Sequence, residues 1–239
     1  MYYCDLTFQS PAENLAFDEA LLDACEDGLV GPVLRFWEPA SAFVVIGYGN
    51  RVAQEVNLPA CERLGVPVFR RCTGGGTVLQ APGCLNYTLI LRMDSHPSLE
   101  GITGTNEYVM EANRACISAL TGLAVERRGH TDLATAGRKF CGNAQRRRRH
   151  FLIFHGCFLL DCDLVLMEQV LQMPSKQPDY RHGRAHTDFL TTLNVAGDDL
   201  KSALKAAWGA AEMLATVPLE RMRSLVREKY SSTDWNLKM

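Results

Sequence analysis

Apolar residues follow a helical spacing near the start of the chain. In residues 10–28 this spacing places four apolar side chains on one side of a helix, namely Leu15, Leu21, Leu22 and Cys25. Ser10, Pro11 and Glu13 match helix start signals, namely a capping serine, a proline in the first turn and the glutamate of a capping box. Gly28 is a suitable stop. The pattern therefore predicts a helix that is capped by the Ser10 side chain.

Runs of β-branched and aromatic residues indicate strands in the middle of the chain. They cover residues 32–39, 41–49, 66–72, 77–80 and 85–93. Residues 50–65 lie between the second and third of these runs. They have a helical pattern that we expect Pro59 to break.

The second half of the chain is mostly helical in pattern. Helices are predicted over residues 104–123, 163–173, 197–214 and 218–230. Residues 124–129 predict a short strand, and residues 132–161 predict a hairpin with the basic run 146–149 at its bend. Strands occupy the middle and helices flank them, without regular βαβ alternation. This order predicts an α/β fold of the α+β type with a mixed or antiparallel sheet.

Composition limits the classes of protein to consider. The 239 residues contain no internal repeat and no Pro/Gly/Ser-rich linker. We therefore expect one domain over residues 1–239, without a separate C-terminal accessory domain. The net charge of −2 provides no general attraction to nucleic acid or to an anionic membrane. No uncharged apolar run reaches the ~20 residues that a membrane-spanning helix needs.

Cysteine usage indicates the compartment. The chain has nine cysteines, an odd number, and none of them forms a CxxC pair. Reduced thiols are the better interpretation for a chain of this length. The N-terminal stretch lacks the basic and apolar regions of a secretory signal. Together these features predict a cytoplasmic protein.

Three consecutive glycines, Gly74, Gly75 and Gly76, stand between two predicted strands. Without side chains, successive backbone N–H groups can surround an anionic ligand. Arg70 and Arg71 precede the glycines and could add positive charge. A loose turn between strands is the alternative. The common nucleotide motifs are missing, because there is no GxxxxGK[ST] and the stretch "VVIGYGNRVA" lacks the third glycine of the dinucleotide fingerprint.

A second candidate region follows in residues 130–164. Lys139 lies in a predicted strand between Gly137 and Gly142, where its ammonium group could stabilise charge on a reacting phosphate or carbonyl. An edge-strand lysine that deters aggregation is the alternative. The run Arg146–Arg149 could bind nucleic acid, form a solvated hairpin tip or dock an acidic carrier domain, and the overall charge argues against nucleic acid.

Several blocks of the sequence resemble lipoate–protein ligases. "RRCTGGGTVLQAPGCLNYTLIL" resembles their lipoate-binding loop, and "DLATAGRKFCGNAQRRRRHFLIFHGCFLLDCDL" resembles their second conserved block. "ENLAFDEALL", "VVIGYGNRVAQEVN" and "PSKQPDYRHGRAHTDFLTTL" match three further blocks. The matches follow the family order from about residue 11 to residue 194. The resemblance implies a fold like that of class II aminoacyl-tRNA synthetases and biotin ligases, with a mostly antiparallel sheet flanked by helices.

The resemblance also implies an activity and a set of residues. A ligase of this family activates lipoate with ATP and Mg²⁺ to lipoyl-AMP and passes the lipoyl group to a carrier lysine. Lys139 matches the catalytic lysine. The positions that match substrate and adenylate contacts are Arg71, Gly74, Gly75, Gly76, Thr77, Asn86, Asp132, Asn143, His155 and Gly156. No metal-ligating side chain is assigned. Arg181 and Arg184 are candidates for contacting the carrier or the nucleotide.

The implied partners are a lipoyl-carrier domain or a protein like the glycine cleavage H protein, with a separate small accessory protein as a further candidate. The sequence departs from the family pattern at Gln80–Ala81, Cys84, Cys141, Phe154 and Cys157. Octanoyltransferases of the same family use a cysteine thioester and no ATP. The cysteines near the expected pocket, Cys72, Cys84, Cys141 and Cys157, keep this second activity open.

Overall fold

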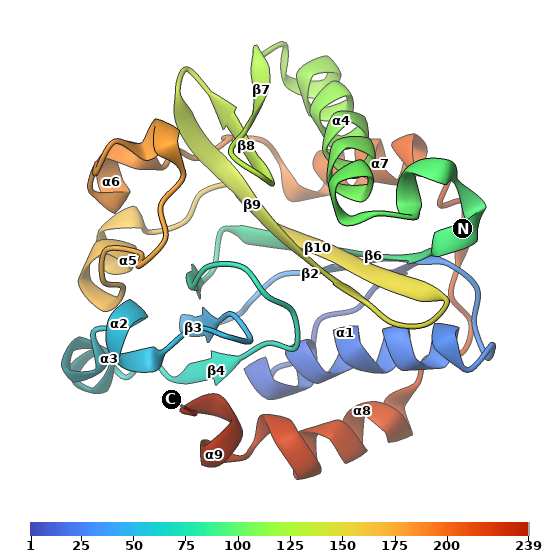
Figure 1. Cartoon of the computed structure of the whole chain (residues 1–239), viewed down its shortest axis with the longest axis horizontal. Helices are drawn as coiled ribbons and strands as arrows, with labels where there is room; N and C mark the ends of the chain where they lie inside the picture. The colour runs from blue at the N-terminus through green and yellow to red at the C-terminus, as the bar shows by residue number, and fades with distance from the viewer. Residues whose placement is uncertain (239) are drawn as a thin grey trace.

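The computed structural model describes residues 1–238. An eight-stranded sheet crosses it, with the strand order β11-β1-β2-β6-β10-β9-β8-β7 (Figure 1). Its strands are β1 (Tyr2–Asp5), β2 (Val33–Trp37), β6 (Cys84–Arg92), β7 (Val125–Arg128), β8 (Asp132–Thr135), β9 (Arg138–Arg147), β10 (Phe151–Leu159) and β11 (Glu212–Met213). All neighbours from β2 to β7 are antiparallel, and only β1 pairs in parallel, with β2 and β11.

A smaller sheet of three strands has the order β4-β3-β5. Its strands are β3 (Phe43–Ile46), β4 (Val68–Arg70) and β5 (Val78–Gln80). The central strand β3 is parallel to β4 and antiparallel to β5. Residues 71–77, here called the glycine loop, connect β4 to β5 around the end of β3.

Helices cover both faces of the large sheet. The helices and short helical turns are α1 (Pro11–Glu26), α2 (Val52–Glu55), α3 (Leu58–Leu64), η1 (Met93–Ser95), η2 (Pro97–Leu99), α4 (Ile102–Thr121), α5 (Leu164–Val170), η3 (Asp179–Arg181), α6 (His186–Phe189), α7 (Gly197–Ala207), α8 (Leu219–Leu225), η4 (Val226–Tyr230) and α9 (Thr233–Asn236). In Figure 1, α4 and α7 lie on one side of the sheet and α1 and α8 on the other. Helices α2, α3, α5 and α6 pack around the small sheet.

Alternation along the strands produces these layers. In β6, Leu85, Leu89 and Leu91 face α4 and α7, whereas Ile90 faces α1. At about 25 cal/mol per Å² of apolar surface removed from water, burial of such side chains is the main force that holds helices and sheet together. Among residues 1–238, no helix has both the length and the apolar character needed to cross a lipid bilayer.

Several sequence predictions need correction in their local detail. Helix α1 begins at Pro11 as expected, but the Ser10 side chain makes no capping hydrogen bond. The Asn14 side chain instead donates to the carbonyls of Phe8 and Ser10 and so fixes the chain that enters the helix. The helix expected over residues 197–214 ends at Ala207, and the strand β11 follows it. The helical region 50–65 breaks at residues 56–57, before Pro59, which lies in the first turn of α3.

Candidate active site

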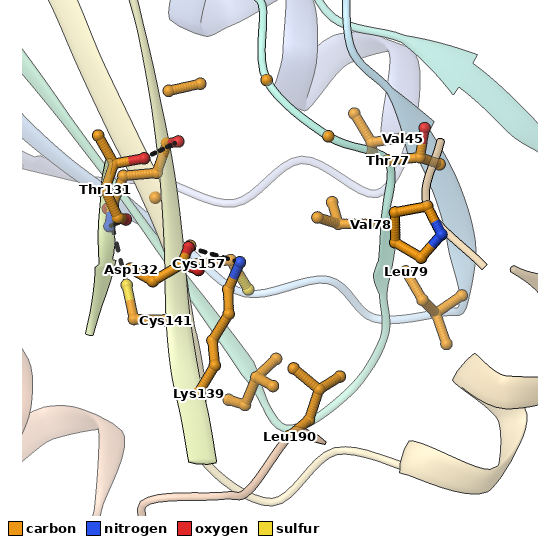
Figure 2. A pocket seen from close by; sticks show the side chains of 18 of the residues that line it. Val45, Thr77, Val78, Leu79, Thr131, Asp132, Lys139, Cys141, Cys157 and Leu190 are labelled. Carbon is orange, nitrogen blue, oxygen red and sulfur yellow. Dashed lines mark hydrogen bonds and ion pairs between the residues drawn. The ribbon is translucent and has the colours of Figure 1, made fainter. Parts of the chain in front are cut away.

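A cavity of about 690 Å³ lies between the large sheet and the small sheet. Figure 2 shows Thr131, Asp132, Lys139 and Cys141 along one wall, facing Val45, Val78 and Leu79 on the opposite wall. The cavity is lined by every residue proposed from the sequence as a substrate contact except Gly74. The structure therefore gathers in one place residues that are up to 85 positions apart (Arg71 to Gly156).

Lys139 and Asp132 form an ion pair at the edge of this cavity. The distance from Lys139 Nζ to Asp132 Oδ1 is 2.7 Å (Figure 2). The second oxygen, Oδ2, accepts a hydrogen bond of 2.9 Å from the hydroxyl of Tyr180. Burial and the charge of Asp132 raise the pKa of Tyr180, so its hydroxyl keeps the proton that it donates. The carboxylate is thus fixed on both sides and holds the ammonium group in place.

A β-bulge directs the Lys139 side chain into the cavity. Lys139 and Gly142 are three residues apart, and in a regular strand they would face opposite sides. The register of β9 against β8 shifts at Phe140, which has no partner in β8, so that Phe140 and Cys141 both face the core. Lys139 then crosses over Gly142, where a Cβ atom would lie 2.6 Å from Nζ.

The glycine loop is shaped by Arg71. Its Nη2 donates hydrogen bonds to the carbonyls of Gly74 and Gly76, and its Nε donates to Thr73 Oγ1. Gly75 has φ +85°, and a Cβ atom there would lie 2.9 Å from Arg71 Nη2. On the other side, a Cβ at Gly47 would lie 2.1 Å from the Gly75 carbonyl oxygen. Close packing within the protein thus requires glycine at position 75.

The two neighbouring glycines are different. A Cβ atom at Gly74 or Gly76 would meet no atom within 4 Å. Packing therefore does not explain these two glycines, and their bare backbone is available to a ligand.

The two arginines beside the loop make hydrogen bonds to backbone carbonyls. Arg70 turns away from the cavity and donates to the carbonyls of Gly47, Asn50 and Trp235, among others. Arg71 uses its guanidinium group on the loop backbone, and burial lowers its pKa to about 10, so it stays charged at neutral pH. Both arginines shape the loop from within.

A buried polar chain links the glycine loop to α1. Thr73 Oγ1 lies 2.7 Å from His155 Nε2, and His155 Nδ1 lies 3.4 Å from Asp18 Oδ2. Asp18 also pairs with the fully buried Arg35 at 2.5 Å. Burial alone would raise the pKa of Asp18, but the charge of Arg35 and the contact with His155 outweigh it, and the pKa lies below its ordinary value. His155 is therefore held in one orientation beside the cavity.

The remaining predicted contacts make hydrogen bonds to the protein. Asn86 exchanges two hydrogen bonds with Gln80, at 2.7 and 2.8 Å. Asn143 accepts from Tyr87 Oη at 2.6 Å and donates to the Thr131 carbonyl at 2.7 Å. A Cβ at Gly156 would lie 1.8 Å from Asn143 Oδ1, so this glycine makes room for the asparagine. Thr77 accepts a longer bond of 3.4 Å from Asn50.

The thiols near the cavity are buried. Cys141 and Cys157 line it, and burial raises the pKa of Cys141. Cys157 donates to Gln80 Oε1 at 3.6 Å. Cys72 belongs to the glycine loop but is not among the residues that line the cavity, and burial raises its pKa to about 11. Cys84 lies in the core beneath the cavity, next to Cys157 and Cys162, and its pKa is also raised. Nucleophilic cysteines have lowered pKa values, so Cys72, Cys84 and Cys141 lack the character of an activated nucleophile.

The basic run makes contacts within the protein. Arg146 lies 3.1 Å from Glu19, and Arg148 lies 2.7 Å from Asp23, both acidic residues of α1. Arg147 donates to the carbonyls of residues 99 and 100. Three of the four arginines are thus engaged by neighbouring elements, which weakens the case for a nucleic-acid site.

The acidic residues of the cavity do not form a metal cage. Residues 1–238 contain no group of three or more His, Cys, Asp or Glu side chains arranged to hold a metal ion. Asp132 is paired with Lys139 and Asp18 with Arg35.

Two residues of the site were missed in the sequence. Asp18 fixes His155, and Tyr180 fixes Asp132. Asp18 could have been found from the sequence, because it is a carboxylate within the apolar run of α1 and a buried charge needs a partner. Tyr180 lies in the segment 174–185, which is irregular apart from the short turn η3, and no pattern marks it.

The family follows from the sequence as a whole. Residues 10–206 match the model of the lipoyl protein ligase A/B catalytic domain. The chain belongs to this family. The predicted resemblance is thereby confirmed.

Other members of the lipoyl protein ligase A/B family match over almost the whole chain. The octanoyltransferase LipM of Geobacillus kaustophilus is 30% identical, over 99% of this chain and 97% of its own. LipM of Lysinibacillus sphaericus is 29% identical, over 96% and 95%. A lipoate-protein ligase A solved with bound ATP is 26% identical, with a TM-score of 0.82 and coverage of 99% and 98%.

More distant structures define the fold. A bipartite lipoate protein ligase from Thermoplasma acidophilum has a TM-score of 0.85 at 24% identity, covering 99% of this chain and 95% of its own. A biotin protein ligase from Leishmania major has a TM-score of 0.52 at 13% identity, covering 96% and 79%. The predicted fold class, a mostly antiparallel sheet flanked by helices as in lipoate and biotin ligases, is confirmed.

Proposed function

We propose that this chain is a lipoate–protein ligase that makes lipoyl-AMP from lipoate and ATP and transfers the lipoyl group to a carrier lysine. The observation that supports it best is the cavity, which combines the Lys139–Asp132 pair and the bare glycine backbone with apolar walls. Its volume of about 690 Å³ lies within the ~300–1,000 Å³ of sites that hold whole small molecules. There is room for a nucleotide as well as an acyl chain.

In the first step, a lipoate oxygen attacks the α-phosphorus of ATP, and the bond to pyrophosphate breaks. Negative charge grows on the phosphoryl oxygens in the transition state. The ammonium group of Lys139, held by Asp132, stabilises that charge without having to reorient. Mg²⁺ enters with the triphosphate as part of the substrate. The bare backbone of Gly76, which lines the cavity, lies against the adenylate.

In the second step, a neutral carrier amine attacks the acyl carbonyl, AMP leaves, and the amine loses a proton. Lys139 donates a hydrogen bond to the oxygen on which charge develops. Val45, Val78 and Leu79 face the fatty chain and keep water from the reactive anhydride (Figure 2). The carrier is a lipoyl domain or a protein like the glycine cleavage H protein. The Thermoplasma acidophilum relative is a bipartite ligase with an E2 lipoyl domain, which supports both this partner and a separate accessory protein.

A second candidate is octanoyl transfer from an acyl carrier protein through a cysteine thioester, without ATP. The names of the relatives that are 29–30% identical favour it. The raised pKa of Cys141 and Cys72 argues against these two thiols as the nucleophile, which leaves Cys157 as the other thiol that lines the cavity.

Lipoate-dependent exchange of labelled pyrophosphate into ATP separates the two activities. A ligase catalyses the exchange, and the variants Cys141→Ser and Cys157→Ser keep it. A transferase gives no exchange, but forms an octanoyl-thioester that mass spectrometry detects and that one of the two serine variants loses. No exchange together with a trapped thioester would overturn the ligase.

A further inference from the structure

Arg181 is a buried arginine whose charge has no acidic partner among residues 1–238. Only 4% of the residue is exposed, and it lines the same cavity as Lys139. Its Nε donates to the carbonyl of Arg184 at 2.9 Å, but its Nη2 is buried without a hydrogen-bond partner. Within residues 1–238, no carboxylate lies within 4.0 Å of its guanidinium group. Burying a guanidinium group without a partner costs free energy of folding, unless a ligand supplies the missing hydrogen-bond acceptors and negative charge.

The surroundings hold Arg181 in place. Arg184 Nε donates back to the Arg181 carbonyl, and Arg184 Nη2 donates to the carbonyls of Tyr180 and Gly137. Both guanidinium groups lie over the ring of Phe189, at 4.8 and 5.2 Å. Arg184 thus donates its hydrogen bonds to the backbone, whereas the outer N–H groups of Arg181 have no acceptor among residues 1–238.

The position of Arg181 is coupled to the reacting centre. Tyr180, its neighbour in sequence, donates to Asp132, which pairs with Lys139. His186 lines the same end of the cavity, and burial together with the charges of Arg181 and Lys139 lowers its pKa, so this imidazole is neutral at pH 7. The positively charged side chains there are Lys139, Arg181 and Lys176, and the carboxylates of Asp132 and Asp179 also line the cavity. A ligand with a second anionic group beyond the one at Lys139 would fit this arrangement.

We propose that Arg181 binds a phosphate group of the substrate that enters this cavity. A guanidinium fork suits phosphate oxygens because it can donate two parallel hydrogen bonds. The phosphate has two possible sources, the terminal phosphates of ATP or the phosphodiester of a phosphopantetheine arm that delivers an acyl thioester. The proposal deepens the proposed function, on which the choice of source rests.

Direct binding tests the site without any assumption about activity. The probe is inorganic pyrophosphate, titrated calorimetrically into the full-length protein. For Arg181→Gln we expect a Kd at least about 10-fold higher, because one charged hydrogen bond is worth ~1.5–3 kcal/mol. Arg181→Lys keeps the charge but loses the fork of N–H donors, so we expect its Kd for pyrophosphate to lie between those of the wild type and Arg181→Gln. Arg138→Gln, an exposed arginine that donates only to the Thr187 carbonyl, is the matched control and binds as the wild type does.

Kinetics identify the source of the phosphate. If it is ATP, Arg181→Gln raises KM for ATP at least about 10-fold in the exchange assay and leaves KM for lipoate unchanged. If it is the phosphopantetheine arm, KM rises for the octanoyl-carrier protein but not for octanoyl-pantetheine, which lacks the phosphate. Arginine-dependent pyrophosphate binding in a protein that shows neither activity would uphold the site and reject the proposed function.

Two results would overturn the proposal. One is that Arg181→Gln leaves pyrophosphate binding and both phosphate-dependent KM values at wild-type levels. The other is that Arg181→Gln and Arg181→Lys change KM for lipoate and for octanoyl-pantetheine as much as for the phosphate-bearing substrates. The guanidinium would then serve only to pack against Phe189.

Discussion

Lys139 can reach Asp132 because the residue beneath its side chain is a glycine. A Cβ at position 142 would lie 2.6 Å from Nζ and 2.8 Å from Cε of the lysine. The end of a lysine chain moves at little cost, so a larger residue would displace the ammonium group rather than unfold the strand. Gly142 is thus a positioning residue that acts through Lys139.

We expect Gly142→Ala to reduce kcat with only a small loss of stability. Lys139→Ala removes the charge itself and should lower the rate about 10²–10³-fold, as the loss of a transition-state donor does elsewhere. Single-turnover rates of adenylate formation and thermal melts of both variants measure these effects. Gly49→Ala serves as the control, since a Cβ there meets no atom within 4 Å. Wild-type turnover by Lys139→Ala would rule out the proposed mechanism.

Gly75→Val tests the glycine loop. Position 75 has φ +85°, and an added side chain would meet the Arg71 guanidinium that shapes the loop. We expect the affinity for lipoate to fall at least about 10-fold, a change of ~1.4 kcal/mol or more. Calorimetric titration of lipoate measures it. An unchanged affinity would mean that the loop does not contact the acyl ligand.

At the scale of elements, α1 and the β9–β10 hairpin are joined by buried charge. Glu19 of α1 accepts hydrogen bonds from Lys229 at 2.6 Å and from Tyr230 at 2.7 Å, and it pairs with Arg146 at the end of β9. The basic run therefore fastens the hairpin to a helix 127 residues away (Glu19 to Arg146), rather than presenting charge to a nucleic acid.

Glu19→Gln should lower the free energy of unfolding by about 3 kcal/mol. This value is the lower end of the cost of breaking a buried ion pair. We expect the lower end because the partners Lys229 and Arg146 are partly exposed to solvent. Urea unfolding measures the change. Glu13→Gln is the control: this α1 carboxylate makes no ion pair among residues 1–238. Equal midpoints for wild type and Glu19→Gln would contradict the assigned role.

The same helix predicts a pH dependence. For Asp18 and Glu19, burial acts to raise the pKa, but Arg35 and Lys229 outweigh it, so both pKa values are lowered in the folded state. A lowered folded-state pKa contributes stability above the unfolded-state values of about 3.9 and 4.3, and this stability disappears as the pH falls through the folded-state values. Urea midpoints between pH 7 and pH 2 should therefore fall in the acid range, and less steeply in Glu19→Gln.

At the scale of the whole molecule, the end of the chain supports the glycine loop. Arg70 Nε donates to the Trp235 carbonyl, and its Nη2 donates to the Lys238 carbonyl. Through Nη1, the same side chain also holds the Gly47 carbonyl, and Gly47 packs against Gly75. One buried arginine thus connects α9, the end of β3 and the loop.

Arg70→Ala should release α9 and loosen the loop together. We expect faster proteolytic cleavage after Lys229 and a several-fold higher KM for lipoate, because several carbonyls lose their donor at once. Arg51→Ala, the substitution of an exposed arginine nearby, is the control. Faster cleavage with an unchanged KM would show that α9 and the loop are independent.

Local patterns in the sequence predicted most of the helices and strands and the family. They did not predict the side-chain contacts between elements. The runs that predicted strands at 85–93 and 132–161 correspond to β6 and to β8, β9 and β10, since hydrophobic alternation is a local property. The Ser10 side chain makes no capping hydrogen bond, whereas the Asn14 side chain holds the backbone of Phe8 before the helix, a contact that depends on how residues 6–8 pack. Arg71, predicted as a ligand contact, lines the cavity, but the sequence did not indicate that its guanidinium also shapes the loop.

The sequence alone determined the family and predicted which side chains would carry the chemistry, because Lys139 and the three glycines stand in ordered motifs that are local in the chain. Only the tertiary structure decided where they point. The bulge at Phe140 turns Lys139 toward Gly142, and the partners of His155 and Arg181 come from distant parts of the chain or are absent among residues 1–238. Register shifts and buried charges result from packing between elements, and neither is encoded in the spacing of nearby residues.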